Sequence, residues 1–312
     1  MRIAISFMNP KRCLSFMLQG ANILVTGGSG FIGTNLIRRL QERGADVLNV
    51  SLDPPQLQVS TIQEDLTISD FEWLDQGFDY VIHLAALTNK RYCENLSEAY
   101  KTNVDVTFRL FEALKGRGVK KIIFPSSVVL YAAGDAALDE ETSPLDIYQD
   151  NYVFTKGLAE FVAKRLQKDL PILIFRFGNI FGPNQDWKVF PNLIPQTITG
   201  AITDKTVEIW NPHPIRDFVF VEDAVDAIIK GLESDYKGTL NVGSGKGTSI
   251  GEMGKKITKI TDARYTALEK PTWGPTKVIC STERIKDALG WQARTDIDAA
   301  LAKTIDFYKD VL

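Results

Sequence analysis

Cysteine and histidine are scarce in this chain of 312 residues. The three cysteines, Cys13, Cys93 and Cys280, lie far apart in the sequence, and none belongs to a CxxC pair. This spacing argues against a disulfide framework and against a zinc site, and it fits a protein of the reducing cytoplasm. The two histidines, His83 and His213, are too few for a histidine-rich metal site. They also make a Ser-His-Asp hydrolase hard to build, so we expect no metal and another kind of catalytic group.

The chain also lacks a strong charge of either sign and a long hydrophobic run. It has 36 basic and 39 acidic side chains, a net charge of −3 and no long basic segment, which argues against nucleic-acid binding. Asn9, Pro10 and nearby charges interrupt the apolar residues of the N-terminal extension, residues 1–18, before they reach the length of an export signal or a membrane span. Either Met17 is the true initiator, or the extension is a short tail.

Short apolar runs alternate with longer amphipathic segments in the first half of the chain. This alternation predicts an α/β fold with a doubly wound, parallel, Rossmann-type sheet covered on both faces. The expected strands are residues 22–26, 46–52, 80–84, 121–125 and 172–176, and the expected helices are 31–43, 96–114 and 153–166.

The texture changes after Gly178, where prolines divide the chain into short pieces. We expect a cofactor domain at 19–177, to which 217–243 returns. Residues 178–216 and 244–312 then form a smaller mixed α/β substrate-binding cap. Its expected helices, and the one in the returning segment, are 222–233, 251–260, 283–289 and 298–308.

A glycine-rich turn, TGGSGFIG at residues 26–33, follows the first expected strand and opens the first expected helix. In that context the motif predicts a dinucleotide site. Gly27 would permit the tight turn, Gly30 would let backbone N–H groups approach a pyrophosphate at the helix N-terminus, and Gly33 would permit close packing of helix and strand.

The end of the second strand distinguishes NAD from NADP, because an acid there binds the ribose 2′-hydroxyl and a base binds a 2′-phosphate. The candidates are Ser51 and Asp53. No lysine or arginine occurs between Arg43 and Lys90 to neutralise a phosphate, which favours NAD. NADP is not excluded, since an arginine of the preceding helix or a residue of the N-terminal extension would be able to fold over the site.

Tyr152 and Lys156 are four residues apart, so they project from the same helix face. An ammonium beside a phenol favours the phenolate and lowers the tyrosine pKa, which provides a general base for a sugar or alcohol hydroxyl. Alone the pair is weak evidence, but Ser126 and Ser127 directly follow an expected strand, at the sheet edge that faces a cofactor crevice.

With these motifs, the chain resembles the extended short-chain dehydrogenase/reductase family, also called the NAD-dependent epimerase/dehydratase family, from about Ala21 onward. The family's motifs occur in its order: residues 26–33, 65–66, 83–86, Asn103, 126–131, 152–156, 176–183, 216–218 and 241–245. The resemblance implies an enzyme that acts on nucleotide sugars, commonly by oxidation at carbon 4 followed by a second step.

The resemblance also implies roles for individual residues. Tyr152 is the acid/base, Lys156 orients the nicotinamide ribose and lowers the tyrosine pKa, and Ser127 hydrogen-bonds the sugar oxygen. Asp65 lies by the adenine, Ala85 and Ala86 line the cofactor, Asn179 contacts the substrate, and Arg216 holds a diphosphate. The expected cofactor-binding set is Gly27, Gly30, Phe31, Ile32, Gly33, Ser51, Asp53, Asp65, Leu66, Leu84, Ala85, Ala86, Asn103, Tyr152 and Lys156. The expected substrate-binding set is Ser127, Asn179 and Arg216.

Departures from the family pattern favour one branch. Similar 4,6-dehydratases carry an Asp-Glu pair after the catalytic serine or threonine, where this chain has Val128 and Val129. Members that invert carbons 3 and 5 place a cysteine soon after the serine and a histidine after Gly-Pro, but Asn184 follows Gly-Pro here. The resemblance therefore favours a 4-epimerase of a UDP- or dTDP-sugar, with a 4-reductase of 4-keto-6-deoxy sugars as the alternative and a non-catalytic NAD sensor less favoured.

Some side chains have two readings. His83 is expected to be a packed strand residue and Asn103 to brace the active-site helix, while Trp210 and Phe190 either stack on a nucleobase or fill the core of the cap. Family habit suggests a homodimer through the helices around 96–114 and 153–166. The apolar residues expected on their outer faces, which equally suit the core, are Leu96, Phe108, Phe111, Phe161 and Leu166.

Overall fold

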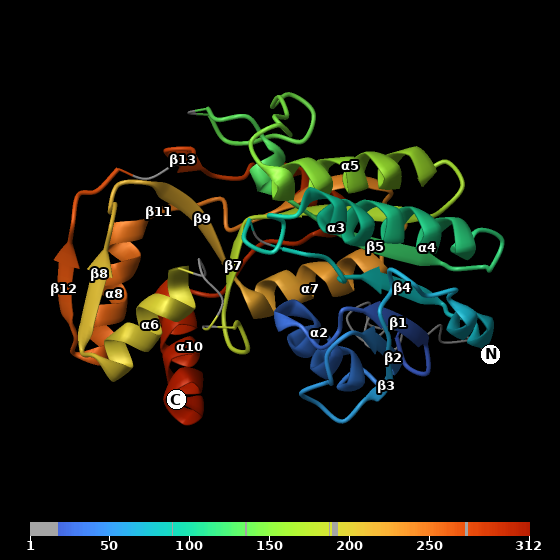
Figure 1. Cartoon of the computed structure of the whole chain (residues 1–312), viewed down its shortest axis with the longest axis horizontal. Helices are drawn as coiled ribbons and strands as arrows, with labels where there is room; N and C mark the ends of the chain where they lie inside the picture. The colour runs from blue at the N-terminus through green and yellow to red at the C-terminus, as the bar shows by residue number, and fades with distance from the viewer. Residues whose placement is uncertain (1–17, 89, 135, 187, 189–192, 272–273) are drawn as a thin grey trace, which may run out of the picture.

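A parallel sheet of seven strands forms the larger part of the computed structural model, which describes residues 18–312 except 89, 135, 187, 189–192 and 272–273 (Figure 1). The strand order is β3-β2-β1-β4-β5-β6-β10, and every neighbouring pair is parallel. The strands are β1 (Asn22–Thr26), β2 (Asp46–Ser51), β3 (Ser60–Gln63), β4 (Tyr80–His83), β5 (Lys121–Ser127), β6 (Ile172–Phe177) and β10 (Gly238–Val242). The chain order reverses between β1 and β4, which opens a crevice at the carboxyl ends of these strands.

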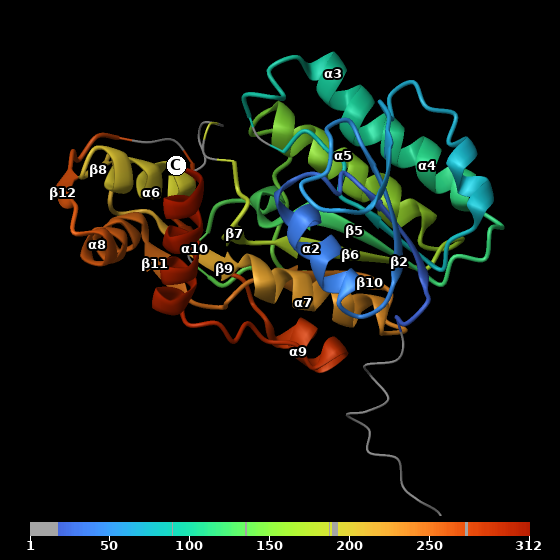
Figure 2. The same ribbon diagram turned by 90° about the horizontal axis from the view of Figure 1, so that it is seen from below.

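Helices cover both faces of this sheet (Figures 1 and 2). One face carries α2 (Phe31–Gln41) and α7 (Val221–Leu232); the other carries α4 (Val106–Leu114) and α5 (Asn151–Leu166), with α3 (Leu96–Tyr100) beside α5. A π-helical segment, η3 (Lys101–Asp105), joins α3 to α4. The predicted doubly wound α/β fold is thus confirmed. Strand β3 lacked a clear sequence signal, because its burial is only partial.

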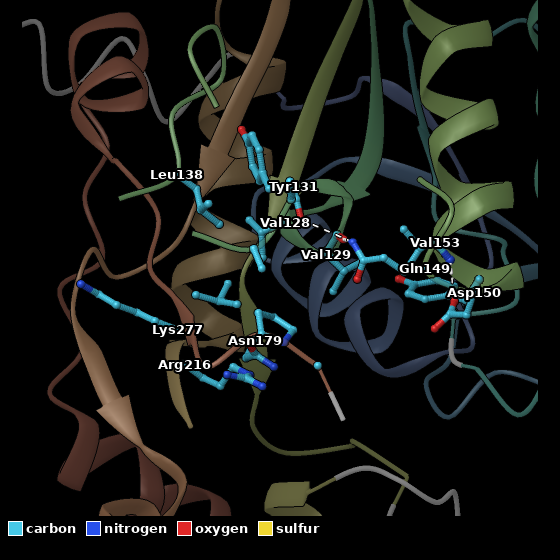
Figure 3. A pocket seen from close by; sticks show the side chains of 16 residues that line it. Val128, Val129, Tyr131, Leu138, Gln149, Asp150, Val153, Asn179, Arg216 and Lys277 are labelled. Carbon is cyan, nitrogen blue, oxygen red and sulfur yellow. Dashed lines mark hydrogen bonds between the residues drawn. The ribbon is translucent and has the colours of Figure 1, made fainter. Parts of the chain in front are cut away.

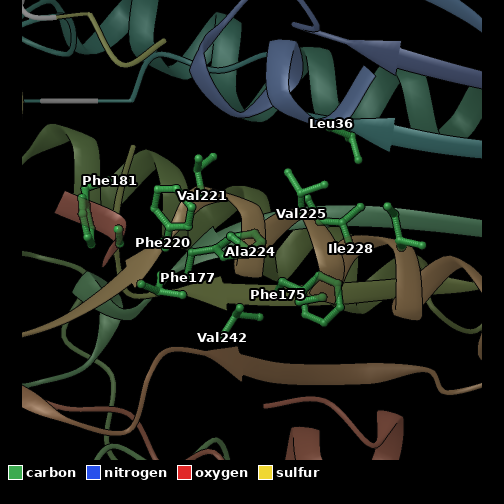
Figure 4. Packing of buried hydrophobic residues seen from close by; sticks show 14 of the residues in the cluster. Leu36, Phe175, Phe177, Phe181, Phe220, Val221, Ala224, Val225, Ile228 and Val242 are labelled. Carbon is green, nitrogen blue, oxygen red and sulfur yellow. The ribbon is translucent and has the colours of Figure 1, made fainter. Parts of the chain in front are cut away.

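Alternation along the strands separates two apolar clusters. In β1, Ile23 and Val25 pack with α2 and α7, whereas Leu24 packs with α4 and α5. In the first cluster, Val225 and Ile228 of α7 lie between Leu36 of α2 and the sheet (Figure 4). The sheet is therefore apolar on both faces, as a parallel sheet requires.

The remaining residues form smaller sheets and helices beside the carboxyl ends of the large sheet. Strand β9 (Ile215–Phe220) pairs with β7 (Asn179–Phe181), β11 (Gly247–Ser249) and β13 (Lys277–Val278), and β8 (Thr206–Ile209) pairs with β12 (Arg264–Ala267). The helices here are α6 (Leu193–Thr203), α8 (Ile250–Thr261) and α10 (Ile297–Val311), and α9 (Glu283–Leu289) contacts β10. Residues 221–242 return to the large sheet as α7 and β10, and β9 joins the small one. The division into two domains remains a prediction.

The expected outer faces of the helices need a correction. Phe111 of α4 and Leu166 of α5 are buried in the core, because they lie on the helix sides that face the sheet. Leu96, Phe108 and Phe161 are exposed, as an outer face requires. In the described part of the chain, no helix has the length and apolar character needed to cross a membrane.

A buried carboxylate joins β9 to two chain segments that are distant in sequence. Asp217 is fully buried and accepts hydrogen bonds from the backbone N–H groups of Ser244 at 2.6 Å, Gly245 at 3.0 Å and Cys280 at 3.0 Å. The Ser244 hydroxyl donates a fourth bond at 2.6 Å. These bonds hold the segments after β10 and β13 against β9.

Replacing Asp217 with alanine should lower the free energy of unfolding by about 3 kcal/mol, because it leaves three backbone N–H groups, one of them the buried N–H of Cys280, without their acceptor. Urea unfolding followed by circular dichroism measures this loss. Asp310→Ala, at an exposed position of α10, is the matched control and should unfold like the unaltered protein. An Asp217→Ala protein with an unchanged midpoint would contradict the assigned role.

Candidate active site

The glycine-rich turn has a backbone geometry that only glycine permits. Gly27 has φ of +71°, and a Cβ there would lie 2.6 Å from the backbone nitrogen of Ala85. A Cβ on Gly33 would lie 2.5 Å from the backbone of Gly28, so this glycine packs against the turn itself. Helix α2 begins just after Gly30, and no acid in its first turn competes for its N–H groups. The cradle therefore fits a pyrophosphate at the helix N-terminus, beside Phe31 and Ile32.

The two candidates for the ribose differ in their surroundings. Ser51 is buried: its hydroxyl accepts a bond from the Ser29 backbone N–H at 3.2 Å and donates to Asn49 Oδ1 at 2.9 Å. Ser51 thus holds the glycine-rich turn. Asp53 is exposed, and its backbone carbonyl accepts a bond of 2.7 Å from the Ser29 hydroxyl, which fixes it beside the turn. Of the two, Asp53 is the better placed to meet a ribose.

The arginines of the preceding helix lie elsewhere. Arg38 and Arg39 occupy the last turn of α2, about 10–16 Å along the helix from the glycine-rich turn, and Arg39 pairs with Glu42 at 2.9 Å. This placement leaves the neutral and acidic character of the ribose end intact.

Residues after β3 and β4 complete the cofactor edge. Asp65 is exposed and accepts a bond from the Thr67 N–H at 2.9 Å, and Leu66 is buried. The partly buried residues Leu84, Ala85 and Ala86 directly follow β4. The structure therefore gathers these positions and the glycine-rich turn at one edge of the sheet, because parallel strands end on the same side.

Asn103 is a bracing residue in its observed contacts. Its Oδ1 accepts a bond from the Leu87 N–H at 2.7 Å, and its Nδ2 donates to the Leu87 carbonyl and to Thr155 Oγ1, both at 3.1 Å. It thereby ties the loop after β4 to α5. His83 is buried, and its ring nitrogens lie 2.6 Å from Thr26 Oγ1 and 3.1 Å from Thr107 Oγ1. Burial lowers the pKa of His83 to about 3, so the ring is neutral.

Helix α5 presents the tyrosine and the lysine at the end of β5. The side chain of Asp150 caps the helix by accepting a bond from the Val153 N–H at 2.9 Å, so that Tyr152 lies in the first turn. Lys156 follows one turn later and is buried, with Nζ 5.0 Å from the centroid of the Phe124 ring. Ser127 ends β5, and its hydroxyl is near enough to the Tyr152 phenol to lower the pKa of that phenol. The structure thus brings the three expected catalytic residues together.

A pocket opens beside Tyr152 between the large sheet and the smaller part (Figure 3). Asn179, the first residue of β7, and Arg216 of β9 line it together with Tyr152. Other lining residues were not predicted from the sequence; they include Gln149 just before α5 and Lys277 of β13. Proximity to Tyr152 in the sequence would have indicated Gln149, whereas Lys277 reaches the pocket only through the pairing of β13 with β9.

Trp210, the aromatic candidate of the cap that the structure describes, is not among the residues that line this pocket. Trp210 is 57% exposed, so the prediction that it fills the core is wrong; it packs instead under Lys270, whose Nζ lies 5.2 Å from the ring centroid. Phe190 lies outside the described residues. Cys93 and Cys280 are buried and free, and Cys13 lies outside the described residues. Among the described residues, no group of three potential ligand side chains is placed to hold a metal ion.

The family model described as the NAD dependent epimerase/dehydratase family matches residues 23–243. The chain belongs to this family. The resemblance drawn from the motifs is thus confirmed, and with it the identity of the protein as an enzyme that uses NAD.

Known relatives within this epimerase/dehydratase family catalyse different reactions. The chain is 29% identical over 265 residues to dTDP-4-dehydro-6-deoxy-D-allose reductase of Streptomyces bikiniensis, covering 77% of this chain and 81% of the relative. It is 26% identical over 324 residues to UDP-glucose 4-epimerase of Bacillus subtilis (strain 168), covering 90% and 94%. Among solved structures, MoeE5 in complex with UDP-glucose and NAD aligns with a TM-score of 0.84 and 27% identity, covering 93% of this chain and 99% of MoeE5.

In this family member, burial governs the charge of the tyrosine, contrary to the sequence expectation. Burial raises the pKa of Tyr152 to about 12, and the hydrogen bond with Ser127 only partly opposes this effect. The expected lowering of the tyrosine pKa by Lys156 was wrong, because helical spacing reveals a neighbouring charge but not the desolvation of the phenol. Burial also lowers the pKa of Lys156 to about 8. At neutral pH the tyrosine is therefore a phenol and the lysine an ammonium.

The free enzyme should show no ionisation of Tyr152 between pH 7 and pH 10. The difference in absorbance at 295 nm between the unaltered protein and Tyr152→Phe isolates this one phenol from the other tyrosines. A difference signal with a midpoint below pH 9 would show that desolvation does not dominate.

Proposed function

We propose that this protein is a nucleotide-sugar 4-epimerase, which oxidises carbon 4 of a UDP- or dTDP-sugar and reduces the opposite face. The observation that carries this proposal is the convergence of Ser127, Tyr152 and Lys156 beside a pocket that also contains Asn179 and Arg216. The set supplies one acid/base and a means of binding, which is sufficient for reversible hydride transfer at a single carbon.

The residues have distinct tasks in this reaction. Bound NAD supplies reversible acceptance of a hydride. Tyr152 must enter this step as the phenolate: it takes the proton of the 4-hydroxyl while the hydride leaves carbon 4, becomes a phenol, and returns the proton after the keto sugar has turned over. Ser127 holds the reacting oxygen, and the Lys156 ammonium stabilises the phenolate form of Tyr152 that the oxidation requires and the reduction regenerates. Arg216, whose pKa burial lowers, holds the diphosphate, since an anion compensates a desolvated guanidinium.

The cofactor is held by the edge of the sheet. Gly27, Gly30 and Gly33, with Phe31 and Ile32, carry the pyrophosphate. Asp53 and Ser51 lie at the ribose of the adenosine half, and Asp65 and Leu66 lie at the adenine. Leu84, Ala85 and Ala86 line the path to the nicotinamide, where Lys156 binds the second ribose and Asn103 supports the loop.

Apolar side chains beside Ser127 argue against dehydration. Val128 and Val129 belong to η4 (Val128–Leu130), a single 3-10 turn at the end of β5, and both line the pocket. Removal of water needs an additional acid and base at such positions, and two valines provide neither.

A 4-reductase is the second candidate. The Streptomyces bikiniensis relative is a reductase, and the same Ser-Tyr-Lys set donates a proton to a 4-keto sugar as readily as it removes one. The difference lies in the cofactor: an epimerase retains NAD through the cycle, whereas a reductase consumes reduced cofactor.

The cytoplasmic location of the protein also remains a prediction.

Incubating the purified protein with a panel of UDP- and dTDP-sugars should yield the 4-epimer without added reductant. Tyr152→Phe should lower kcat by about 10²- to 10⁴-fold, because it removes the general base. Tyr148→Phe, at an exposed tyrosine four residues earlier in the sequence and outside α5, is the control and should keep full activity. Consumption of a 4-keto sugar only with added NADPH would favour the reductase. No turnover with tight NAD binding would favour the sensor.

A homodimer is the expected assembly, through α3, α4 and α5. These neighbouring helices expose Leu96, Tyr100, Phe108 and Phe161, whose exposed fractions are 43–47%. Such a set of apolar side chains on one face suits an interface between two copies.

Sedimentation at micromolar concentration should give twice the chain mass of 34.8 kDa. Phe108→Glu with Phe161→Glu should give a monomer, because charges then enter the interface. Trp210→Glu, an exposed aromatic of the cap, should leave the mass unchanged. Finding the unaltered protein to be a monomer would contradict the proposed homodimer.

A further inference from the structure

A fully buried carboxylate lies beneath the catalytic residues. Glu160 follows Lys156 by four residues and Tyr152 by eight on α5, so the three share one side of the helix. Its exposed fraction is 0%, although a glutamate is seldom completely buried. A buried charge needs compensation, so the partners of Glu160 identify what it does.

Three polar groups surround this carboxylate. Arg176 of β6 donates from Nε to Oε2 at 3.0 Å and from Nη2 to Oε1, which is a bidentate pair. The hydroxyl of Ser126 donates to Oε2 at 2.6 Å, and Lys164 Nζ lies 2.8 Å from Oε1. Burial alone would raise the pKa of Glu160, but the bonds and charges of Arg176 and Lys164 hold it below its ordinary value. The carboxylate is therefore ionised at neutral pH.

These contacts fix the helix relative to three strands. Ser126 immediately precedes the catalytic Ser127 at the end of β5. Arg176 also lies 4.7 Å from the ring centroid of Tyr131, whose hydroxyl donates to Asn241 Oδ1 of β10 at 2.8 Å. The carboxylate thus binds β5 and β6 directly. It is linked to β10 through Arg176, Tyr131 and Asn241.

The same carboxylate acts on the catalytic lysine. The titratable groups near Lys156 are Glu160, one turn later on α5, Cys93 before α3 and His83 on β4; Tyr152 lies one turn earlier on α5. His83 and the phenol are neutral at pH 7. Burial lowers the pKa of Lys156, and among the surrounding charges Glu160 opposes this most strongly.

We propose that Glu160 is a positioning residue for the reaction: its carboxylate sets the register of α5 against β5 and keeps Lys156 protonated inside the site. Without the carboxylate, the ammonium would lose its proton near neutral pH and would no longer stabilise a phenolate at Tyr152. This inference rests on the proposed role of Lys156, but its first test requires neither cofactor nor substrate.

The test is an NMR titration of Lys156 in protein labelled with 13C- and 15N-lysine, with the signal assigned by its loss in Lys156→Met. In Glu160→Gln the lysine pKa should fall by about one unit, a tenfold weaker hold on the proton. Glu160→Asp retains the charge and should largely restore the pKa. Glu222→Gln, at an exposed glutamate of α7, is the control and should have no effect.

Glu160→Gln leaves the Arg176 guanidinium buried without its counter-charge and is expected to reduce stability. The double variant Glu160→Gln/Arg176→Met removes both charges and serves where the single variant does not fold. It should lower the Lys156 pKa in the same direction by a smaller amount. An unchanged Lys156 pKa in either folded variant would overturn the proposal, as would equal shifts in Glu160→Gln and Glu160→Asp.

Kinetics provide a second readout once a substrate is known. The ammonium form is lost as pH rises through the lysine pKa, so the alkaline limb of kcat in Glu160→Gln should move about one unit lower, with KM unchanged. An unmoved alkaline limb would contradict the proposal. Failure of every nucleotide sugar to react would refute the proposed function, while the NMR titration would still decide the role of Glu160.

Discussion

The common direction of the seven strands is the constraint on which the rest of this structure depends. Because all strands of the large sheet are parallel, their carboxyl ends lie on one edge, and the covering helices α2, α4 and α5 carry the chain back from β1 to β2, from β4 to β5 and from β5 to β6. Parallel pairing alone therefore places three segments at one edge: the glycine-rich turn after β1, the loop after β4 and the serines that end β5. The smaller part lies at this same edge, so that Arg216 and Asn179 face the tyrosine across one pocket.

Burial sets the chemical state of this edge. It opposes charge on a phenol and on an ammonium alike, so the pKa of Tyr152 is raised and that of Lys156 is lowered from their ordinary values. Compensation comes from neighbours at fixed positions: the Ser127 hydroxyl for the tyrosine, and the Glu160 carboxylate for the lysine. The protonation of Tyr152 and of Lys156 therefore depends on residues outside this pair, one on β5 and one further along α5.

The parts of the site that could be predicted from the sequence are those encoded locally. The turn at Gly27 and Gly33 and the four-residue spacing of Tyr152 and Lys156 are local, and the family motifs are written in order along the chain. Lys277 could not be found, because strand pairing alone brings it to the pocket. The tyrosine pKa was misjudged for a different reason: the spacing of two residues contains no measure of how far the fold removes the phenol from water. Phe111 was ambiguous because periodicity shows that a helix has an apolar side, not which neighbour covers it.

The two ends of the site differ in how freely they can diverge. At Gly27 and Gly33, any side chain would collide with backbone atoms less than 3 Å away, so selection can retain only one residue type at each position. Val128 and Val129 stand on a single turn whose backbone is held by Ser127, which accepts the Val129 N–H at 3.3 Å, and their side chains face the pocket. Val129 is 38% exposed, so a functional group can replace it more freely than Val128, which is buried in a cluster with Tyr131 and Val278. The residues that form the cofactor turn are therefore constrained, whereas a position that lines the substrate pocket can change. Both lie at the same edge of the sheet.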